Sequence, residues 1–464
     1  MFRTLAAALA ISTIATTAHA APVDPARLDA KSIDAAVQSA ITASGAPSAQ
    51  VAVVQDGHIV FSKAYGQAQL SPAVPATTAT RYEIASVSKE FTAAAALLLA
   101  EDGKLSLDDH VSKWFPELTG ADQITVRQLL THTAGVSDFW PQDYVMLPMT
   151  KPTTPRDLME TWAKRPLDFV PGQDWQYSNT GYVVAGQIIE KVSGKPLFDF
   201  VRDRILIPVG IHDAIDTSAQ HLAAPDALGY ERRALAANRP TPADGTGWLY
   251  GSAFLGLTAE DVAKWDISFL KKSLLKPESY VTEVTTAKLV GGPNAGKDTN
   301  YAMGLDIGKV NGHATVSHDG EGAGYLSLNR IYPDDGLAIV VLTNTMSGGA
   351  TGEIADRIAN MALPPQGTDA HLRQIFEGLQ AGHIDRTAFT EDANGYMTEA
   401  TVADFQSTLG PLGEPATFTL TRSAQRGGME YRGYRIRAGR TTLSLSVYLT
   451  KAGLIEQFLV NEVK

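Results

Sequence analysis

The 464-residue chain contains no cysteine. This absence excludes a thiol nucleophile, an iron–sulfur or zinc–thiolate site, a disulfide and a lipidated N-terminal cysteine. Long apolar runs are also missing: the stretch from Leu5 to Ala15 is shorter than the about 20 residues that a membrane helix needs, and no later run is longer than Ala93–Ala100. We therefore expect no stable membrane insertion.

Positive charge is scarce as well. The chain has 39 Lys and Arg against 50 Asp and Glu, a formal net charge of −11, with no block of like charge. This balance argues against nucleic acid as a partner. The sequence has neither a His-Glu-x-x-His motif nor a Gly-x-Ser-x-Gly elbow, so no metal, no cofactor and no α/β-hydrolase site is implied.

The N-terminus has the layout of a secretory signal peptide. Arg3 precedes the apolar run, and Ala18-His19-Ala20 stands just before Ala21. We expect residues 1–20 to be removed near Ala20, leaving an exported protein. A cysteine-free exported chain suits the bacterial periplasm or the medium, so we predict a periplasmic or secreted location.

Residues 21–363 have the pattern of a mixed α/β unit. Asp56-Gly57 between two β-rich runs predicts a hairpin that starts an antiparallel sheet. An Ala- and Leu-rich stretch from Ser86 ends at Gly103 and predicts a helix. Further elements are expected as helices at 180–192, 258–270 (with Thr258 as N-cap) and 351–361, and strands at 313–318, 325–332 and 337–344.

Pro364-Pro365-Gln366-Gly367 predicts a linker over residues 364–369. After it, residues 370–464 predict a small α+β accessory domain. Its expected elements are helices at 370–380 and 399–409 and strands at 416–421, 430–437, 442–450 and 454–460. The sequence does not predict an oligomeric state.

Three short motifs carry chemistry: Ser86-Val87-Ser88-Lys89, Tyr177-Ser178-Asn179 and His318-Asp319-Gly320. Ser-x-x-Lys is weak evidence alone, because it recurs at Ser268–Lys271 and Ser273–Lys276. We interpret Ser268 as ordinary helix surface, since a serine late in a helix has no free backbone N–H groups around it. The order of the three motifs gives the first match its weight.

Serine becomes a nucleophile when a base accepts its proton. Lys89, one turn along and partly desolvated, could have its pKa lowered enough to do this, and Tyr177 could do the same as a phenolate. The residues therefore indicate a Lys–Tyr pair as the base. The Ser86 backbone N–H and an N–H from the strand after Gly320 would stabilise the oxyanion.

Each residue also has a plain structural interpretation. Ser86 could be only a helix cap, Asn179 could cap the helix at 180–192, and His318 could be a strand-end histidine with its hydrogen bonds satisfied. Found together in this order, they favour catalysis. His132, in a turn that ends with Ala-Gly, is better interpreted as a hydrogen-bonded structural histidine than as a general base.

With these motifs, the chain resembles the serine β-lactamase and penicillin-binding protein superfamily, in the branch of class C β-lactamases, D-Ala-D-Ala carboxypeptidases, D-aminopeptidases and related esterases. The resemblance covers about residues 33–363. It is supported by Leu129–Gly135, Pro171-Gly172 and Gly256–Asp261. The tail resembles the nuclear-transport-factor and cystatin-like folds.

The resemblance implies a β-lactamase-like fold: a mixed α/β domain with an antiparallel sheet, an all-α subdomain, and the active site between them. It also implies roles for individual residues. Ser86 would be the acylated nucleophile, and Lys89 and Tyr177 would carry protons. Asn179 would bind the substrate amide. His318 would take the position of the lysine in Lys-Thr-Gly, and Glu321, after Gly320, would supply the backbone N–H donor of the strand.

The third motif departs from Lys-Thr-Gly. A mostly neutral histidine followed by Asp319 and Glu321 would repel a substrate carboxylate. This favours a serine hydrolase of neutral esters, amides or amine-bearing D-amino-acid peptides, thus a small-molecule or peptide substrate. The alternatives are a β-lactamase or D-Ala-D-Ala carboxypeptidase, a penicillin-type ligand sensor without turnover, and an assembly module.

Overall fold

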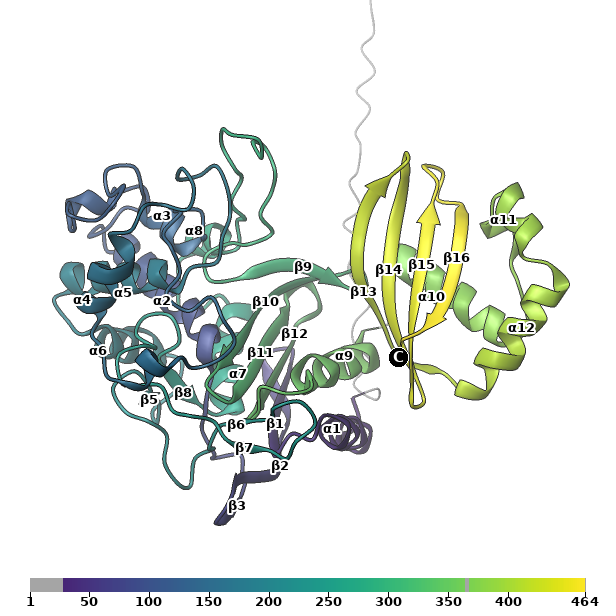
Figure 1. The fold of residues 1–464 in the computed structure, drawn as a ribbon, viewed down its shortest axis with the longest axis horizontal. Coiled ribbons are helices and arrows are strands. Elements are labelled where there is room, and N and C mark those ends of the chain that lie inside the picture. Colours follow the sequence, from purple (N-terminus) through teal and green to yellow (C-terminus); the bar gives the residue numbers. More distant parts are fainter. Residues whose placement is uncertain (1–27, 364–366, 464) are drawn as a thin grey trace, which may run out of the picture.

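The computed structural model of the chain describes residues 28–363 and 367–463. The expected signal peptide and residues 364–366 of the expected linker lie outside the described residues. Figure 1 shows a larger body that ends with α9 and a smaller body that begins with α10. In the described ranges, no helix is both long and apolar enough to cross a membrane.

A seven-stranded antiparallel sheet, ordered β3-β2-β1-β12-β11-β10-β9, forms the centre of the larger body. Its first hairpin turns at Asp56 and Gly57, whose φ angles are 50° and 74°. Two positive φ values suit the tight turn that Asp-Gly favours, so the hairpin prediction is confirmed. The strands are β1 (Ser48–Gln55), β2 (His58–Leu70), β3 (Ala73–Pro75), β9 (Asp306–Val310), β10 (His313–Gly322), β11 (Tyr325–Tyr332) and β12 (Leu337–Thr343).

Both faces of the sheet are buried at its middle strands β1 and β12. Neighbouring side chains of a strand point to opposite faces, so successive residues of β1 enter two different cores. Val51 of β1 packs into a core shared with α1 (Ala30–Ser44) and α9 (Ala350–Ala362). Ala52, the next residue, packs into a second core that includes α7 (Ala259–Leu270). A strand covered on both faces is rich in apolar residues, as β1 is from Val51 to Val54.

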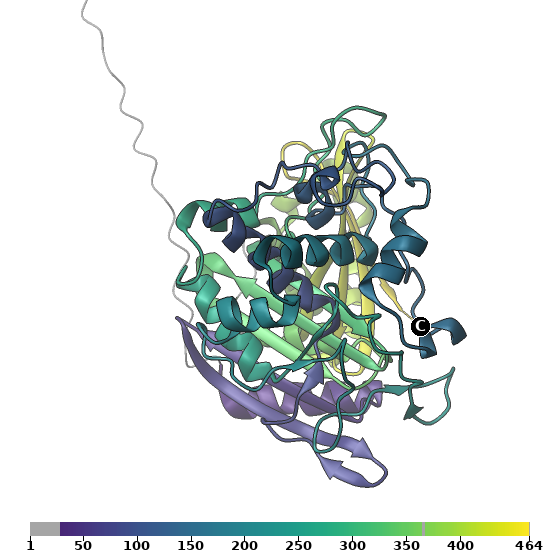
Figure 2. The same ribbon diagram turned by 90° about the vertical axis from the view of Figure 1, so that its left-hand side faces the viewer.

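The helical part of the larger body is built around α2 (Ser88–Glu101). This helix is buried from Ser88 to Leu99. Figure 2 views the molecule from the helical side, with these helices in front of the central sheet. The other helices are α3 (Val126–Leu130), α4 (Pro155–Leu158), α5 (Asn179–Ser193), α6 (Leu197–Val201) and α8 (Pro277–Glu283), and the short strands are β4 (Tyr82–Glu83), β5 (Ile215–Asp216), β6 (Tyr230–Glu231), β7 (Arg239–Pro240) and β8 (Leu255–Leu257).

The smaller body has its own hydrophobic core between three helices and an antiparallel sheet ordered β13-β14-β15-β16. The sheet curves around α10 (Figure 1). The four expected strands and two expected helices are confirmed, while α10 starts earlier than expected and α11 was not predicted. The elements are α10 (Gly367–Gln380), α11 (Glu391–Tyr396), α12 (Glu399–Leu409), β13 (Pro415–Arg426), β14 (Met429–Ala438), β15 (Thr441–Leu449) and β16 (Ile455–Glu462).

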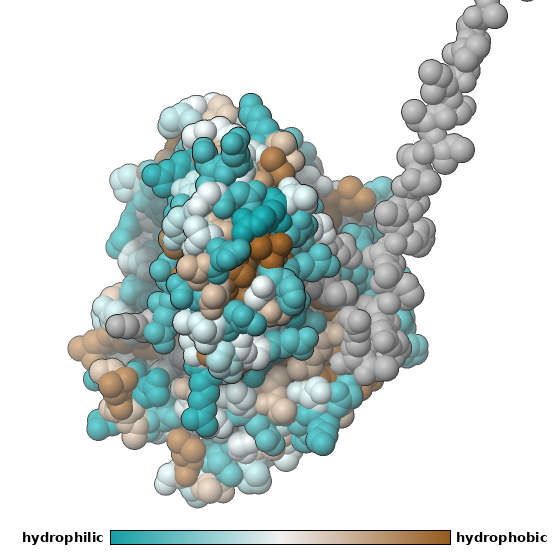
Figure 3. Space-filling view, turned by 90° about the vertical axis from the view of Figure 1, so that its right-hand side faces the viewer, coloured by the Kyte–Doolittle hydropathy of each residue, from teal (hydrophilic) through white to brown (hydrophobic). Residues whose placement is uncertain are grey.

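Polar contacts join the two bodies where α9 lies beside β13. An Arg437 guanidinium N–H on β14 donates to Glu353 on α9 over 2.9 Å, and Thr419 donates to Asp356 over 3.3 Å. Asp356 also pairs with Arg330 of β11 at 2.7 Å, so the contact continues into the central sheet. Seen from the side of the smaller body, the surface is mostly hydrophilic, with small hydrophobic areas (Figure 3).

Candidate active site

Ser86 lies in a 3₁₀ turn, Ala85–Val87, immediately before α2. The helix expected from Ser86 thus begins two residues later, at Ser88. Ala85 has a φ of 45°, in the left-handed region that non-glycine residues rarely adopt. Such strain is found where a backbone is held for function, and here it sets the direction of the Ser86 backbone.

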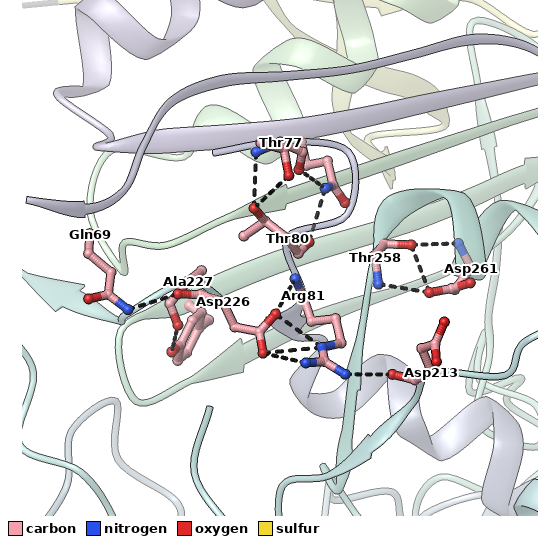
Figure 4. A network of polar contacts seen from close by, with 11 residues as sticks. Gln69, Thr77, Thr80, Arg81, Asp213, Asp226, Ala227, Thr258 and Asp261 are labelled. Atoms are coloured by element: carbon pink, nitrogen blue, oxygen red, sulfur yellow. Dashed lines mark hydrogen bonds and ion pairs between the residues drawn. The ribbon is translucent and has the colours of Figure 1, made fainter. Parts of the chain in front are cut away.

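A polar network holds the chain that leads into this turn (Figure 4). The Arg81 side chain and backbone N–H both donate to Asp226, and Arg81 Nη1 also donates to the Asp213 carbonyl over 2.9 Å. The side-chain amide of Gln50 donates to the carbonyls of Thr77 and Thr80. These contacts anchor β4, which ends three residues before Ser86.

Lys89 is completely buried beside Ser86. Its Nζ donates to Ser86 Oγ at 3.0 Å, Asn179 Oδ1 at 2.8 Å and the Ser252 carbonyl at 3.0 Å. Burial lowers the pKa of Lys89 to about 7, although Asp138 and Asp319 favour its charged form. The neutral amine of Lys89 is therefore accessible at neutral pH and can accept the Ser86 proton.

Tyr177 contacts the same lysine, whose Nζ lies 4.7 Å from the centre of the phenol ring. Burial raises the pKa of Tyr177 well above its usual value, and this effect exceeds the opposing hydrogen bond with Ser86. The phenol thus keeps its proton. Of the two members of the expected Lys–Tyr pair, Lys89 suits the base and Tyr177 suits a proton donor.

Asn179 is the first residue of α5, and Ser178, not Asn179, caps that helix through its Oγ. The Asn179 amide oxygen accepts from Lys89, while its amide nitrogen donates to Asp138 over 3.3 Å. Asp138 also accepts the Asn179 backbone N–H over 2.9 Å. Asn179 thus faces the cleft with its side chain already oriented, and Asp138 is a supporting residue that the sequence analysis missed.

The third motif lies within β10, which extends four residues beyond His318 instead of ending near it. Along this stretch His318 and Gly320 are buried, while Asp319 and Glu321 are exposed. β9 pairs with β10 only as far as Ser317, so the edge from His318 onward is free to border the cleft. A Cβ atom on Gly320 would lie 2.4 Å from the Ile84 carbonyl oxygen and 3.1 Å from the Ser86 nitrogen. Only glycine therefore lets the strand pack against the Ser86 turn.

His318 has both ring nitrogens engaged. Its Nδ1 contacts the Asp319 carbonyl, which can only accept, so Nδ1 carries the proton. Nε2 must then accept the hydroxyl of Tyr301, which lies 2.9 Å away. Burial and the Lys89 charge lower the pKa of His318 to about 4. His318 is thus neutral at pH 7 and supplies no positive charge at this edge of the cleft.

His132 is buried behind the cleft, as a structural histidine would be. Its Nδ1 accepts the Ser178 backbone N–H over 3.1 Å. Its ring centre lies 4.2 Å from that of Tyr177, 4.7 Å from that of Tyr301 and 5.2 Å from that of Tyr182. Burial lowers the pKa of His132 well below its usual value.

A cavity of about 620 Å³ opens above Ser86. Of the predicted site residues, Ser86, Tyr177, Asn179, His318 and Glu321 line it, with Lys89 buried beneath and Gly320 against the Ser86 turn. The lining includes five carboxylates and no lysine or arginine. These carboxylates are Asp138, Asp143, Asp306, Asp319 and Glu321. Within the described part of the chain, no group of acidic and histidine side chains could hold a metal ion.

The two other Ser-x-x-Lys sequences, which begin at Ser268 and Ser273 and which we call decoy motifs, lie away from this cavity. Ser268 is in α7, where its Oγ donates to the Trp265 carbonyl over 2.8 Å. The prediction that Ser268 is helix surface was wrong, because this face of α7 packs into the core and leaves the side chain 4% exposed. Neither Ser268 nor Ser273 lines the cavity.

Comparisons with known proteins identify the family and the fold. Residues 33–362 match the sequence model of the family described as Beta-lactamase. Protein flp of Staphylococcus aureus (strain MW2) is 29% identical over an alignment of 326 residues that covers 68% of this chain and 63% of flp. The chain thus spans less than two thirds of that relative.

Solved structures show the same fold. The D-stereospecific amidohydrolase from Streptomyces sp. superposes with a TM-score of 0.62 at 24% identity, covering 73% of this chain and 100% of the amidohydrolase. The octameric penicillin-binding protein homologue from Pyrococcus abyssi has a TM-score of 0.62 at 21% identity, covering 94% of this chain and 96% of the homologue. The second likeness includes the smaller body.

Proposed function

Because this chain belongs to the Beta-lactamase family, we propose that it is an exported serine hydrolase that acts through an acyl-enzyme at Ser86. The observation that carries this proposal is the buried Lys89, whose Nζ lies 3.0 Å from Ser86 Oγ and whose pKa is lowered to about 7. A surface lysine beside a capping serine would have neither property. Export is inferred from residues 1–20 alone.

The contacts of Lys89 suit proton transfer. A neutral amine keeps two N–H bonds, which can stay on Asn179 Oδ1 and the Ser252 carbonyl, and its lone pair then faces Ser86 Oγ. Attack forms the Oγ–carbon bond, moves the hydroxyl proton to Lys89 and leaves an oxyanion that the Ser86 N–H can stabilise. An N–H of β10, at Glu321, is the second proposed donor.

Collapse of this intermediate breaks the bond to the leaving group. The leaving nitrogen or oxygen takes a proton from Tyr177, which is replenished from Lys89, and the acyl group remains as an ester of Ser86. Water then attacks that ester and gives a proton to Lys89, and Lys89 returns the proton to Ser86 Oγ as the bond to Oγ breaks and the acid is released. Each step uses groups that line the cleft or lie beneath it.

The carboxylates of the cavity support a substrate class. With His318 neutral and no lysine or arginine in the lining, a substrate carboxylate would meet mainly carboxylates, whereas an ammonium group would be attracted. We therefore propose amides or esters that carry an amine, such as D-amino-acid amides, ahead of β-lactams and D-Ala-D-Ala peptides. The likeness to the D-stereospecific amidohydrolase supports this order.

A substrate panel tests the proposal. The mature full chain is assayed on a p-nitrophenyl ester, a D-aminoacyl anilide, nitrocefin and a D-Ala-D-Ala peptide. Ser86→Ala should abolish turnover, while Ser268→Ala, in the decoy motif, should keep it. Equal turnover by wild type and Ser86→Ala would refute the proposal. A Ser86 mass adduct that persists for hours without product would instead indicate a ligand sensor.

A further inference from the structure

His132 makes more contacts with the segment around Tyr177 than a core histidine needs. Its backbone carbonyl accepts the Gln176 N–H over 3.0 Å, and its Nδ1 accepts the Ser178 N–H over 3.1 Å. The residues before and after Tyr177 are thus both bound to His132. The imidazole also packs on the phenol ring itself, with 4.2 Å between ring centres.

Two further features show that packing alone does not account for His132. Its φ of 60° lies in the left-handed region, which is unfavourable for a residue with a Cβ. Because Nδ1 accepts a backbone N–H, the neutral ring carries its proton on Nε2, and this buried N–H has no acceptor among the described residues. An apolar side chain would fill the space without leaving a donor unpaired.

We propose that His132 is a positioning residue that holds Tyr177 in place against Lys89 and Ser86. It binds the backbone on both sides of Tyr177 and supports one side of its ring, which fixes the phenol within reach of the leaving group. His132 does not line the cavity, so it acts through Tyr177 and does not touch substrate. This inference rests on the proposed function, in which Tyr177 passes the proton.

Two amide substitutions separate the hydrogen bond from the volume of the ring. His132→Asn places its Oδ1 near the position of Nδ1, and asparagine tolerates the left-handed conformation. His132→Gln places its amide one bond further out and loses the acceptor at that position. His313→Asn is a matched control, because His313 is another buried histidine, bonded to Asp335 and absent from the cavity lining.

The experiment measures kcat and KM of the full chain on the D-aminoacyl anilide, whose leaving nitrogen needs the proton from Tyr177, together with thermal unfolding. His132→Gln should lower kcat by about 10²-fold at nearly unchanged KM, since a misplacement of about 1 Å has that effect. His132→Asn should recover most of the loss. His313→Asn should lower the unfolding temperature and leave kcat unchanged.

A double-mutant cycle with Tyr177→Phe isolates the coupling. If His132 acts through Tyr177, His132→Gln should have little further effect on kcat once the phenol is gone. An equal loss in both backgrounds would overturn the inference, as would a loss in His132→Asn as deep as in His132→Gln. If His132→Gln does not fold, the crystal structure and the kcat of His132→Asn decide. An unmoved Tyr177 with most of the wild-type kcat is expected, and a displaced Tyr177 without loss of kcat would overturn the inference.

The two proposals fail in different ways. Turnover that does not depend on Ser86 removes both. Turnover that depends on Ser86 and Tyr177, with effects of His132→Gln that simply multiply those of Tyr177→Phe, removes only the role of His132.

Discussion

Lys89 and Glu90, two successive residues of α2, lead into two buried polar clusters that are built in opposite ways. Lys89 has three hydrogen-bond acceptors around Nζ. The Glu90 carboxyl, which belongs to the second cluster, accepts from Trp265 and Asn329. Of its neighbours Asp266 and Glu283, Glu283 has no hydrogen-bond partner on either carboxyl oxygen within the described residues. We call Glu90, Asp266 and Glu283 the carboxyl cluster.

Burial drives both clusters toward neutrality, but with different results. It lowers the pKa of Lys89 to about 7, and it raises the pKa of Asp266 and of Glu283 to about 8 each. The lysine ends close to the pH at which a base works best, because acceptors are in place for its protons. The carboxyls hold protons firmly at neutral pH and have few partners. Burial alone therefore does not make a catalytic group; the arrangement of partners does.

The largest expected effect is the loss of turnover when Lys89 is replaced. Lys89→Met removes the base and should lower kcat on the p-nitrophenyl ester by about 10³-fold, within the range for loss of general acid–base catalysis. Glu90→Gln is the matched control, since an amide replaces a carboxyl that already holds its proton, and it should keep full turnover. If Lys89→Met retains turnover, Tyr177 is the base instead.

The next largest effect concerns the carboxyl cluster and how the free energy of unfolding changes with pH. The pKa of Asp266 rises on folding from 3.8 to about 8, and that of Glu283 from 4.5 to about 8. The folded state binds these protons more tightly, so their contribution is complete below about pH 4 and is lost as pH rises through about 8. Asp266→Asn/Glu283→Gln should therefore gain stability relative to wild type as pH increases.

Urea unfolding at pH 5, 6, 7 and 8 checks this expectation. The difference between variant and wild type isolates the two carboxyls from Lys89 and His318, whose lowered pKa values act in the opposite direction. A difference that stays constant with pH would show that the carboxyl cluster is not protonated in the folded protein.

A smaller effect tests whether the carboxylates of the cleft recognise an amine on the substrate. Asp319→Asn and Glu321→Gln each remove an exposed charge from the free edge of β10, so kcat/KM for the D-aminoacyl anilide should fall by up to about fivefold per charge, the upper range for an exposed ion pair. The kcat/KM for the neutral ester should not fall, and added salt should reduce the loss on the anilide. An equal loss on both substrates would mean that these carboxylates do not recognise an amine.

The sequence predicts the elements whose signals are local. Asp56-Gly57 requires a tight turn and Thr258-Ala259-Glu260-Asp261 a helix start, and the structure confirms both, the latter as a capping box. The spacing of Ser86 and Lys89 likewise brings them together on one side of a helix start. Each prediction depends only on residues within a few positions of one another.

The sequence does not predict the positions of Asp138, Tyr301 and the carboxyl cluster, because these depend on packing between segments that are far apart in the chain. Asp138 and Tyr301 lie in irregular loops, where no periodicity places a side chain. Glu90 and Asp266 sit on helices of ordinary composition, and only the packing of α2 and α7 against the sheet makes them buried. The role of His132 was hidden too, because its partners at 176–178 are more than 40 residues away.

The smallest expected effect is a shift in the pH profile of kcat/KM when a cleft charge that acts on Lys89 is removed. In the proposed mechanism deprotonated Lys89 is the active form, so kcat/KM on the neutral ester should rise with pH and reach half of its maximum near pH 7. Asp319 favours the charged form of Lys89, and so Asp319→Asn should lower its pKa and move this midpoint to lower pH. Asp306→Asn, which removes a carboxylate from the same cavity that does not act on Lys89, should leave the midpoint in place. A midpoint that shifts equally in both variants would report a general change in cleft charge, and one that shifts in neither would mean that Lys89 is not the group whose titration limits the reaction.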